Sequence, residues 1–290
     1  MHFNGFYRPA TAAEAVHLAR EIGAEAMYIA GGTDVLVAAR ENNSYRTRTL
    51  IDLSAVEELK QIAEQPDCIH LGALVTHAAI AASPVIQKYA GVLAAACGEV
   101  GSPQIRNRGT IGGNIANASP AADSYGPLAM LNARVTLLDG QGLRVVPLQE
   151  AVAGAGRSGL RQGELLCEVW IDKLGPEYRQ RFYKIGRRAA LSISRLTASV
   201  AARMDPAGKI ADLRMALGAA FPRPMVFPEI NSMAVDQVPS AQLIDRLVEA
   251  LMGKLPEIAG VRPSTEYKQT AGTAVLQRLL CDVFEVNDNE

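Results

Sequence analysis

The chain has 290 residues, of which 49% are hydrophobic and 20% are charged, and its formal net charge is −1. This length is enough for two domains with a sizeable core. The near-zero charge gives no electrostatic reason to expect nucleic acid or an anionic membrane surface as a partner. No apolar run approaches the roughly 20 residues of a membrane span, and the first residues lack the basic and apolar regions of a signal peptide. We therefore expect a cytoplasmic protein.

Residues 1–60 are predicted to form a first lobe with a β-α-β-α-β pattern. A capping box at Thr11–Glu14 opens a helix to about Ile22, and a second capping box is predicted at Ser54–Glu57. The other expected elements are strands at Ala26–Ala30 and Arg48–Leu53 and a short helix at Leu36–Glu41.

Residues 61–175 are predicted to form a second lobe that mixes strands and helices. Ser83 and Pro84 supply an N-cap and a first-turn proline for one of its helices, and Gly98–Gly109 reads as a loop because of its Gly, Ser, Pro and Asn content. The expected strands are near Ile62 and at Cys68–Leu71, Arg134–Leu138, Leu143–Leu148 and Leu165–Ile171, and the expected helices are Thr76–Ala82, Ala90–Cys97 and Asp123–Leu131.

Residues 176–290 are predicted to form a separate domain, with the boundary at Asp172–Tyr178. Three consecutive strands followed by helices indicate an α+β domain with an antiparallel sheet. The expected strands are Arg181–Ile185, Thr197–Met204 and Ile210–Ala216, the expected helices are Ser240–Leu255 and Ser264–Val286, and Asn287–Glu290 is expected to be a frayed tail.

Two stretches combine paired glycines with polar side chains. The first reads Tyr28-Ile29-Ala30-Gly31-Gly32-Thr33-Asp34-Val35, and the second reads Thr110-Ile111-Gly112-Gly113-Asn114. Glycine pairs occur where the backbone needs a positive φ or must be approached without a Cβ in the way. Each pair alone fits an ordinary tight turn, but two of them suggest a diphosphate held from two sides by backbone N–H groups and hydroxyls. Neither stretch is a nicotinamide or nucleoside triphosphate fingerprint.

The cysteines and histidines give no sign of a metal site or of a nucleophile. Cys68, Cys97, Cys167 and Cys281 are too far apart for a C-x-x-C pair, and the four histidines are equally scattered. We therefore expect no metal ligands and no catalytic side chains in this chain.

Four segments together resemble the FAD-binding medium subunit of the molybdenum hydroxylases, the family of xanthine dehydrogenase and carbon monoxide dehydrogenase. They are Ala30–Asp34, Gly101–Asn107, Thr110–Asn114 and Ser119–Asp123, and the resemblance covers nearly the whole chain. It implies a two-lobed FAD-binding domain of the para-cresol methylhydroxylase type, followed by a smaller α+β C-terminal domain. It also implies FAD as the cofactor, with molybdopterin and [2Fe–2S] clusters only on partner subunits. We expect the FAD to be noncovalent, because neither glycine stretch contains a histidine or a cysteine.

The resemblance also assigns expected roles to residues. Tyr28–Val35 and Thr110–Asn114 would surround the diphosphate of FAD, with Thr33, Thr110 and Asn114 as side-chain donors. Asp123 would lie at a hydroxyl of the ribose or ribityl chain, and matching positions near the flavin are Val100, Leu166 and Lys184. Alternatives remain for the charged residues: Asp34 and Asp123 fit helix N-caps, and Lys184 fits a solvated surface charge.

In this family a large molybdopterin subunit hydroxylates the substrate, and a small subunit relays electrons to FAD, from which NAD or another acceptor receives them. We therefore expect these two partner subunits, in a dimer of heterotrimers. Thr33-Asp34 is nearer to the xanthine dehydrogenase form, since the carbon monoxide form often has His-Ser there. The paired Arg187 and Arg188 either attract the phosphates of NAD or lie in a solvated loop.

Other functions also fit the sequence. The chain could be the FAD subunit of a carbon monoxide, nicotinate or aromatic acyl-CoA hydroxylase. It could also be a stand-alone flavin oxidoreductase on the same fold, which would be active without partners. A binding or assembly module that has lost FAD would be colourless, and the intact glycine pairs argue against it.

Overall fold

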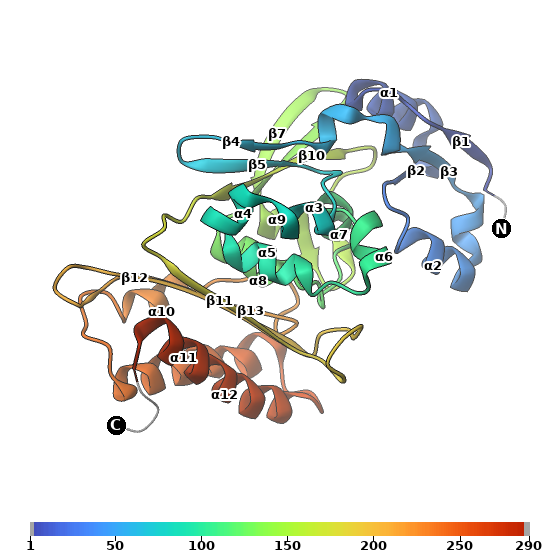
Figure 1. Cartoon of the computed structure of the whole chain (residues 1–290). Helices are drawn as coiled ribbons and strands as arrows, with labels where there is room; N and C mark the ends of the chain where they lie inside the picture. The colour runs from blue at the N-terminus through green and yellow to red at the C-terminus, as the bar shows by residue number, and fades with distance from the viewer. Residues whose placement is uncertain (1–2, 287–290) are drawn as a thin grey trace. The chain divides into compact units, whose positions relative to one another are not determined.

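The computed structural model describes residues 3–286, so the expectation for the tail Asn287–Glu290 lies outside the described residues. The chain divides into two compact units (Figure 1). The first consists of Met1–Ile80, Ser102–Ser119 and Asn132–Asp172. The second consists of Ala81–Gly101, Pro120–Leu131 and Lys173–Glu290. Because two helical segments from the middle of the chain group with the C-terminal residues, the division at residues 60 and 175 stays a proposal.

The first unit contains two main sheets. In the smaller one the strand order is β1-β3-β2 and all pairs are parallel; in the larger one the order is β4-β5-β10-β6-β7 and all pairs are antiparallel. The strands are β1 (Gly5–Tyr7), β2 (Ala26–Ile29), β3 (Thr49–Asp52), β4 (Ile62–Glu64), β5 (Cys68–Gly72), β6 (Arg134–Asp139), β7 (Gly142–Pro147) and β10 (Leu165–Asp172). A small hairpin pairs β8 (Val152–Gly154) with β9 (Arg157–Ser158).

The helices of the first unit are short apart from α1 (Ala12–Ile22), which packs against both sheets. Thr11 caps it by accepting a hydrogen bond from the amide of Glu14 at 3.1 Å, and four apolar residues at helical spacing form its buried face. The other helices are α2 (Val35–Glu41), α3 (His77–Ala82), α6 (Pro103–Arg108), α7 (Ile111–Asn117) and α9 (Leu148–Ala151). The last two residues of α3 group with the second unit. Four 3-10 turns lie at Gly23–Glu25, Asn43–Thr47, Leu53–Ala55 and Glu57–Lys60.

The second unit has the expected three-stranded antiparallel sheet, in the order β11-β12-β13. Two long helices, α11 and α12, bury their apolar sides with β12 and β13 in one continuous core. Shorter helices α5 and α8 also contact this sheet. The elements are α4 (Pro84–Tyr89), α5 (Gly91–Gly98), α8 (Tyr125–Met130), β11 (Arg179–Ile185), β12 (Leu196–Met204), β13 (Ile210–Gly218), α10 (Pro228–Ser232), α11 (Ala241–Ala259) and α12 (Thr265–Phe284).

Three local predictions were wrong. Gly98–Gly109 is not all loop, because Ser102 caps α6 and Pro103 occupies its first turn, as Ser83 and Pro84 do for α4. The second glycine pair is not in a tight turn, since it lies in the first turn of helix α7. Ser54 caps nothing: Asp52 accepts a hydrogen bond from the amide of Ser54 instead.

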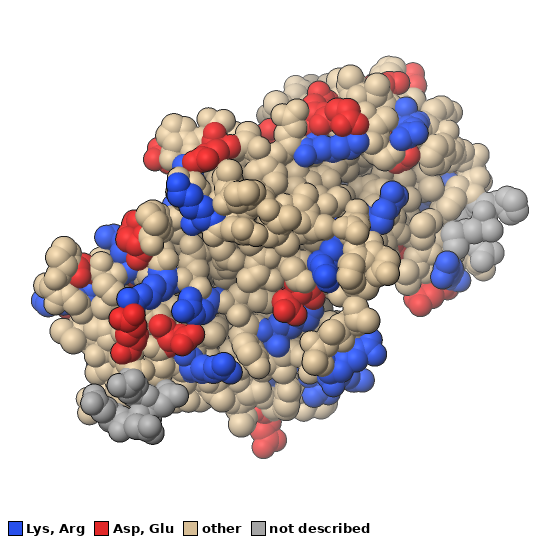
Figure 2. Space-filling view, in the orientation of Figure 1, with Lys and Arg blue, Asp and Glu red and all other residues tan. Residues whose placement is uncertain are grey.

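Charged side chains of both signs are interspersed on the face in Figure 2, and their numbers in the chain nearly balance, with a net charge of −1. Among residues 3–286, no helix combines the length and the apolar character needed to cross a membrane.

Candidate functional site

The first glycine stretch is the turn between β2 and α2. Side chains alternate along the strand: Tyr28 and Ala30 pack against the core around α1, and Ile29 approaches Gly32 and Leu36. Tyr28 and Ala30 therefore contribute packing to this stretch, although both stay partly exposed.

The two glycines of this turn differ in what surrounds them. A Cβ on Gly31 would lie 1.8 Å from the carbonyl oxygen of Arg108, so this glycine lets the backbone at the end of α6 pack directly against the turn. Gly32 has a φ of +74°, and a Cβ there would meet only the side chains of Leu36 and Ile29, at 3.2 and 3.4 Å. Gly31 thus serves packing, and Gly32 serves the shape of the turn.

The turn presents unused backbone donors. In the described part of the chain, the amides of Gly32, Thr33, Asp34 and Val35 have no hydrogen-bond acceptor. Consecutive amides of this kind form a concave cradle for an anion, so the turn fits a diphosphate.

In the second stretch, Thr110–Asn114, the backbone amides after Thr110 already donate hydrogen bonds within the protein. The hydroxyl of Thr110 accepts from the amide of Gly113 at 3.1 Å and so caps α7. The amides of Ile111 and Gly112 donate to the carbonyls of Val75 and Ala73, at 3.0 and 2.9 Å. This stretch therefore has less to offer an anion than was expected, mainly the hydroxyl proton of Thr110.

The two glycines of this stretch also differ in the space around them, as those of the first pair do. Gly112 is buried, and a Cβ there would lie 2.5 Å from the Cβ of Ala73. A Cβ on Gly113 would meet only the hydroxyl of Thr110, at 3.0 Å. Gly113 is thus the member of this pair that leaves open space beside the backbone.

Asp34 joins the two stretches. It precedes α2, but its side chain caps nothing, so the N-cap interpretation of its carboxylate is wrong. Its carboxylate instead accepts from Asn117 of α7 at 2.9 Å and from the hydroxyl of Thr33 at 3.3 Å. Sequence analysis missed Asn117, although it lies one helical turn after Asn114 and so on the same side of α7.

His77 lies beneath the junction of α6 and α7. A Cβ on Gly109, the residue between those helices, would be 3.2 Å from the imidazole ring. Only 2% of His77 is exposed, and this burial lowers its pKa to about 4. The imidazole is therefore neutral at ordinary pH.

The second unit holds a buried ion pair. Nζ of Lys184 on β11 lies 2.6 Å from the carboxylate of Asp123 and donates to the carbonyl of Glu99 at 2.8 Å. Ser194 donates to the other carboxylate oxygen. Burial raises the pKa of Asp123, whereas the hydrogen bonds from Lys184 and Ser194 lower it. The side chains of Lys184 and Asp123 are only 9% and 7% exposed, so Lys184 is not a solvated surface charge.

A cavity of about 460 Å³ lies between Lys184 and the segment Gly186–Ser192. Within this segment Nε of Arg188 donates to the carbonyls of Ala190 and Leu191, at 3.0 and 3.2 Å, so its guanidinium braces the loop. Arg187 is exposed and has no hydrogen bond or ion pair among the described residues.

The remaining predicted positions fall into both units. Leu166 is buried in β10 opposite Leu137 of β6, in the first unit. Val100 lies two residues after the end of α5 and belongs to the second unit, as Asp123 and Lys184 do. Within residues 3–286 there is no group of three or more His, Cys, Asp or Glu side chains that could hold a metal ion.

Comparison with known proteins gives matches along almost the entire chain. Residues 1–173 match the family described as the FAD binding domain in molybdopterin dehydrogenase, and residues 181–283 match the CO dehydrogenase flavoprotein C-terminal domain. The nicotinate dehydrogenase FAD-subunit of Eubacterium barkeri is 31% identical over 284 residues, which cover 97% of this chain and 96% of that protein.

Two further relatives agree with these matches. The xanthine dehydrogenase FAD-binding subunit of Escherichia coli O157:H7 is 28% identical over 268 residues, covering 92% of this chain and 91% of that protein. Among solved structures, carbon monoxide dehydrogenase of Hydrogenophaga pseudoflava aligns with a TM-score of 0.89 at 22% identity, over 98% of both chains. The structural match confirms the predicted mixed helix-and-sheet fold.

Proposed function

Because the chain belongs to the family of FAD-binding subunits of the molybdopterin dehydrogenases, we propose that it passes electrons from the [2Fe–2S] clusters of a partner subunit to an acceptor. FAD, the cofactor of this family, supplies the redox chemistry, and the protein supplies binding and orientation. The observation that carries the proposal is the turn Gly32–Val35, whose four amides lack acceptors in the described part of the chain.

The chain's own residues would divide the work of holding FAD. The amides of Gly32–Val35 receive the diphosphate, and the link from Asp34 to Asn117 keeps this turn against α7. The open side of Gly113 and the hydroxyl of Thr110 border the same ligand. In the second unit, Lys184 holds a positive charge in a buried setting, which would stabilise an electron-rich flavin ring. Asp123 and Ser194 keep its ammonium group in place.

The complex would resemble those of the relatives. Proteins named as FAD subunits and medium chains are parts of larger enzymes, so we place this chain with a molybdopterin-binding large subunit and a small [2Fe–2S] subunit. We propose a cytoplasmic dimer of heterotrimers of the xanthine dehydrogenase type. Nicotinate is the principal alternative substrate, because the nicotinate dehydrogenase subunit has the highest identity to this chain of the three relatives described above.

Co-purification and turnover test this proposal. The chain isolated from its native cell should bring two subunits with it, one containing molybdenum and one containing iron, and the complex should oxidise xanthine. A complex that oxidises nicotinate but not xanthine would be of the nicotinate dehydrogenase type instead. A yellow chain that purifies without partners and oxidises a substrate by itself would instead make it a stand-alone flavoenzyme.

For the acceptor we propose NAD, with Arg187 rather than Arg188 as the cation that meets its phosphates. The guanidinium of Arg188 already serves carbonyls of its own loop, whereas that of Arg187 is free among the described residues. A charge-assisted hydrogen bond to phosphate contributes ~1.5–3 kcal/mol, so Arg187→Ala should raise the apparent constant for NAD roughly tenfold. Turnover with a dye acceptor should stay unchanged. An equal loss with both acceptors would mean that Arg187 supports the flavin or a subunit contact.

A further inference from the structure

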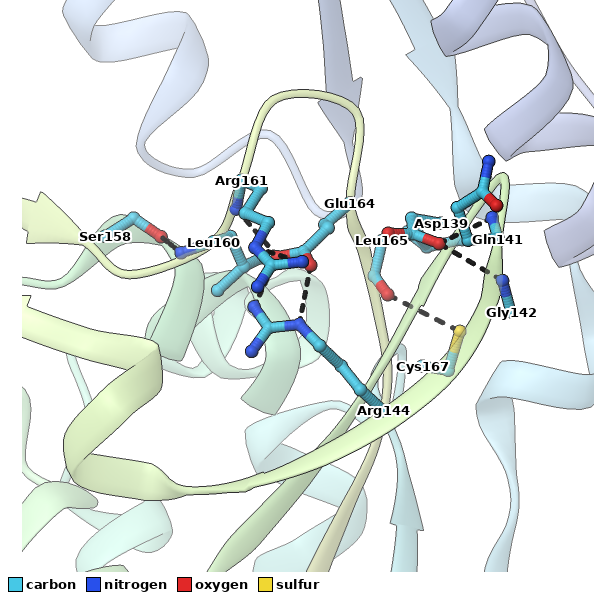
Figure 3. Close-up of polar contacts among 10 residues, drawn as sticks. All are labelled: Asp139, Gln141, Gly142, Arg144, Ser158, Leu160, Arg161, Glu164, Leu165 and Cys167. Carbon is cyan, nitrogen blue, oxygen red and sulfur yellow. Dashed lines mark hydrogen bonds and ion pairs between the residues drawn. The ribbon is translucent and has the colours of Figure 1, made fainter.

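The turn Arg161–Glu164 before β10 is held by a buried carboxylate. The side chain of Glu164 is only 1% exposed, and it accepts from Nε and Nη2 of Arg144 at 2.6 and 2.7 Å. It also accepts from the amide of Arg161 at 2.7 Å (Figure 3). Bidentate, charge-assisted hydrogen bonds are strong and directional. The turn is therefore fixed to β7, the strand that carries Arg144.

The same turn reaches across to the strand that leads into the first glycine pair. The hydroxyl of Tyr28 on β2 donates to the carbonyl of Gly163 at 2.9 Å. Gln162 donates through Nε2 to the carbonyl of Gly23 at 3.1 Å, just before that strand. Burial raises the pKa of Tyr28, with a further contribution from Cys167, so its hydroxyl keeps the proton that it donates.

Strand β2 needs such a support. It has four residues, none fully buried, and it lies at the edge of its sheet next to β3 alone. Beyond it the two glycines add backbone freedom. On the far side of the glycines, Asp34 is bound to Asn117. The amides of Gly32–Val35 that lack acceptors thus lie between two hydrogen bonds, one from Tyr28 to Gly163 and one from Asn117 to Asp34.

We propose that the turn Arg161–Glu164 is a brace that sets the position of the amides of Gly32–Val35 for FAD, with Tyr28 and Glu164 as positioning residues that need not touch the cofactor. The inference rests on the proposed function, because it concerns the FAD of that site. It predicts that FAD binding and the order of the brace are linked, since each stabilises the other reciprocally.

Tyr28→Phe tests the link with the smallest change. It removes one hydroxyl and keeps the ring that packs against the α1 core. We expect the dissociation constant for FAD, measured by titrating the deflavinated chain, to rise about five- to tenfold. The melting temperature of the apoprotein should fall by no more than about 2–4 °C, the shift expected from the loss of one hydrogen bond. Tyr7→Phe is the matched control: Tyr7 lies on β1 of the same sheet, its hydroxyl has no hydrogen bond among the described residues, and FAD affinity should stay at the wild-type value.

Glu164→Gln tests the other end of the brace. The amide keeps the shape of the side chain but repels one nitrogen of the Arg144 guanidinium, so FAD affinity should fall as for Tyr28→Phe. Hydrogen exchange gives a second measurement on the full chain. FAD should slow exchange at the amides of Arg161 and Glu164, which bond within the turn, in the wild type but not in Tyr28→Phe.

The possible results distinguish a failure of this proposal from a failure of the proposed function. Wild-type FAD affinity in Tyr28→Phe contradicts the proposal. So does an affinity loss that comes with a larger fall in the melting temperature of the apoprotein than one hydrogen bond explains. Hydrogen exchange at the amides of the turn Arg161–Glu164 that does not change when FAD binds also contradicts the proposal. A wild-type chain that binds no FAD at all contradicts the proposed function instead.

Discussion

At the scale of single residues, the two glycine pairs show the same division of labour. Gly31 and Gly112 each let another backbone segment pack closely, against Arg108 and Ala73 respectively. Gly32 and Gly113 have more open surroundings, limited only by side chains. Within each pair, one glycine therefore allows close backbone packing, and the other has more open space beside it.

Substitutions should separate these two roles. Gly31→Ala forces a Cβ against the carbonyl of Arg108, and overpacking of this kind costs roughly 1–3 kcal/mol or more, so the free energy of unfolding of the apoprotein should fall in a urea titration.

Gly113→Val should leave the apoprotein folded but displace FAD, because its Cβ meets only Thr110. Gly32→Val should also displace FAD, with some added strain from its φ of +74°. Full flavin content in Gly113→Val and Gly32→Val would contradict our placement of the diphosphate.

His77 makes stability depend on pH. Its folded pKa is about 4 against 6.5 for an unperturbed histidine, so between these values the unfolded chain binds more protons than the folded one. The stabilisation is thus fully present above pH 6.5 and is lost as the pH falls toward 4, by about 3 kcal/mol in total.

The substitution His77→Gln should remove this dependence. Urea denaturation of the apoprotein at several pH values between 4 and 7 measures it. We expect a shallower slope for His77→Gln than for the wild type, and His17→Gln, which changes an exposed histidine on α1, is the control. Identical slopes for His77→Gln and the wild type would show that folding does not shift the pKa of His77.

At the scale of elements, helix α7 shows how a short helix can be both capped and packed. Thr110 caps it, and its first two amides bond to the segment Ala73–Val75 that follows β5. This leaves the free amides on the turn before α2 rather than at the start of α7. The second stretch therefore supports the first, which offers the donors.

Thr110 should accordingly matter to both stability and FAD. Thr110→Val removes the cap, which typically costs about 1 kcal/mol, together with the hydroxyl that borders the ligand, so both unfolding free energy and FAD affinity should fall. Thr110→Ser should restore both. Ser83→Ala removes the equivalent cap of α4 and should lower stability alone. If Ser83→Ala weakened FAD as much as Thr110→Val, the effect would be one of general stability.

At the scale of the whole molecule, the predicted FAD residues lie in both compact units. The two glycine stretches and Leu166 belong to the first unit, and Val100, Asp123 and Lys184 belong to the second. The second unit thus contains more than the C-terminal domain, because helices α4, α5 and α8 group with it. The two family matches each cover one continuous range, 1–173 and 181–283, whereas each compact unit is made of three separate segments.

We expect FAD to be held without a covalent bond. Neither glycine stretch contains a histidine or a cysteine, the usual points of flavin attachment. Precipitation of the whole protein with acid should therefore leave the yellow colour in the supernatant. Flavin that stays with the pellet would contradict this expectation, and a flavoprotein with a known covalent link is the control.

The sequence by itself determined the family, the α+β fold with its antiparallel C-terminal sheet, and most helix starts. These features depend on local signals: caps such as Thr11 and Ser240, which bond residues three positions on, and the alternation of side chains along a strand. Ser102 and Pro103 carried the same signal for α6, but the glycines and asparagines around them outweighed it in our prediction.

Only the tertiary structure decided which glycines pack, which amides stay free and which charges are buried. The reason is separation along the chain: Asp123 and Lys184 are 61 residues apart, Asp34 and Asn117 are 83 apart, and Tyr28 and Gly163 are 135 apart. No local pattern specifies such partners, because they meet only when separate strands and helices pack together. The sequence therefore left Lys184 with two interpretations, a position near the flavin or a surface charge, and gave no sign of its ion pair with Asp123. Glu164 drew no notice at all until the fold brought it to Arg144.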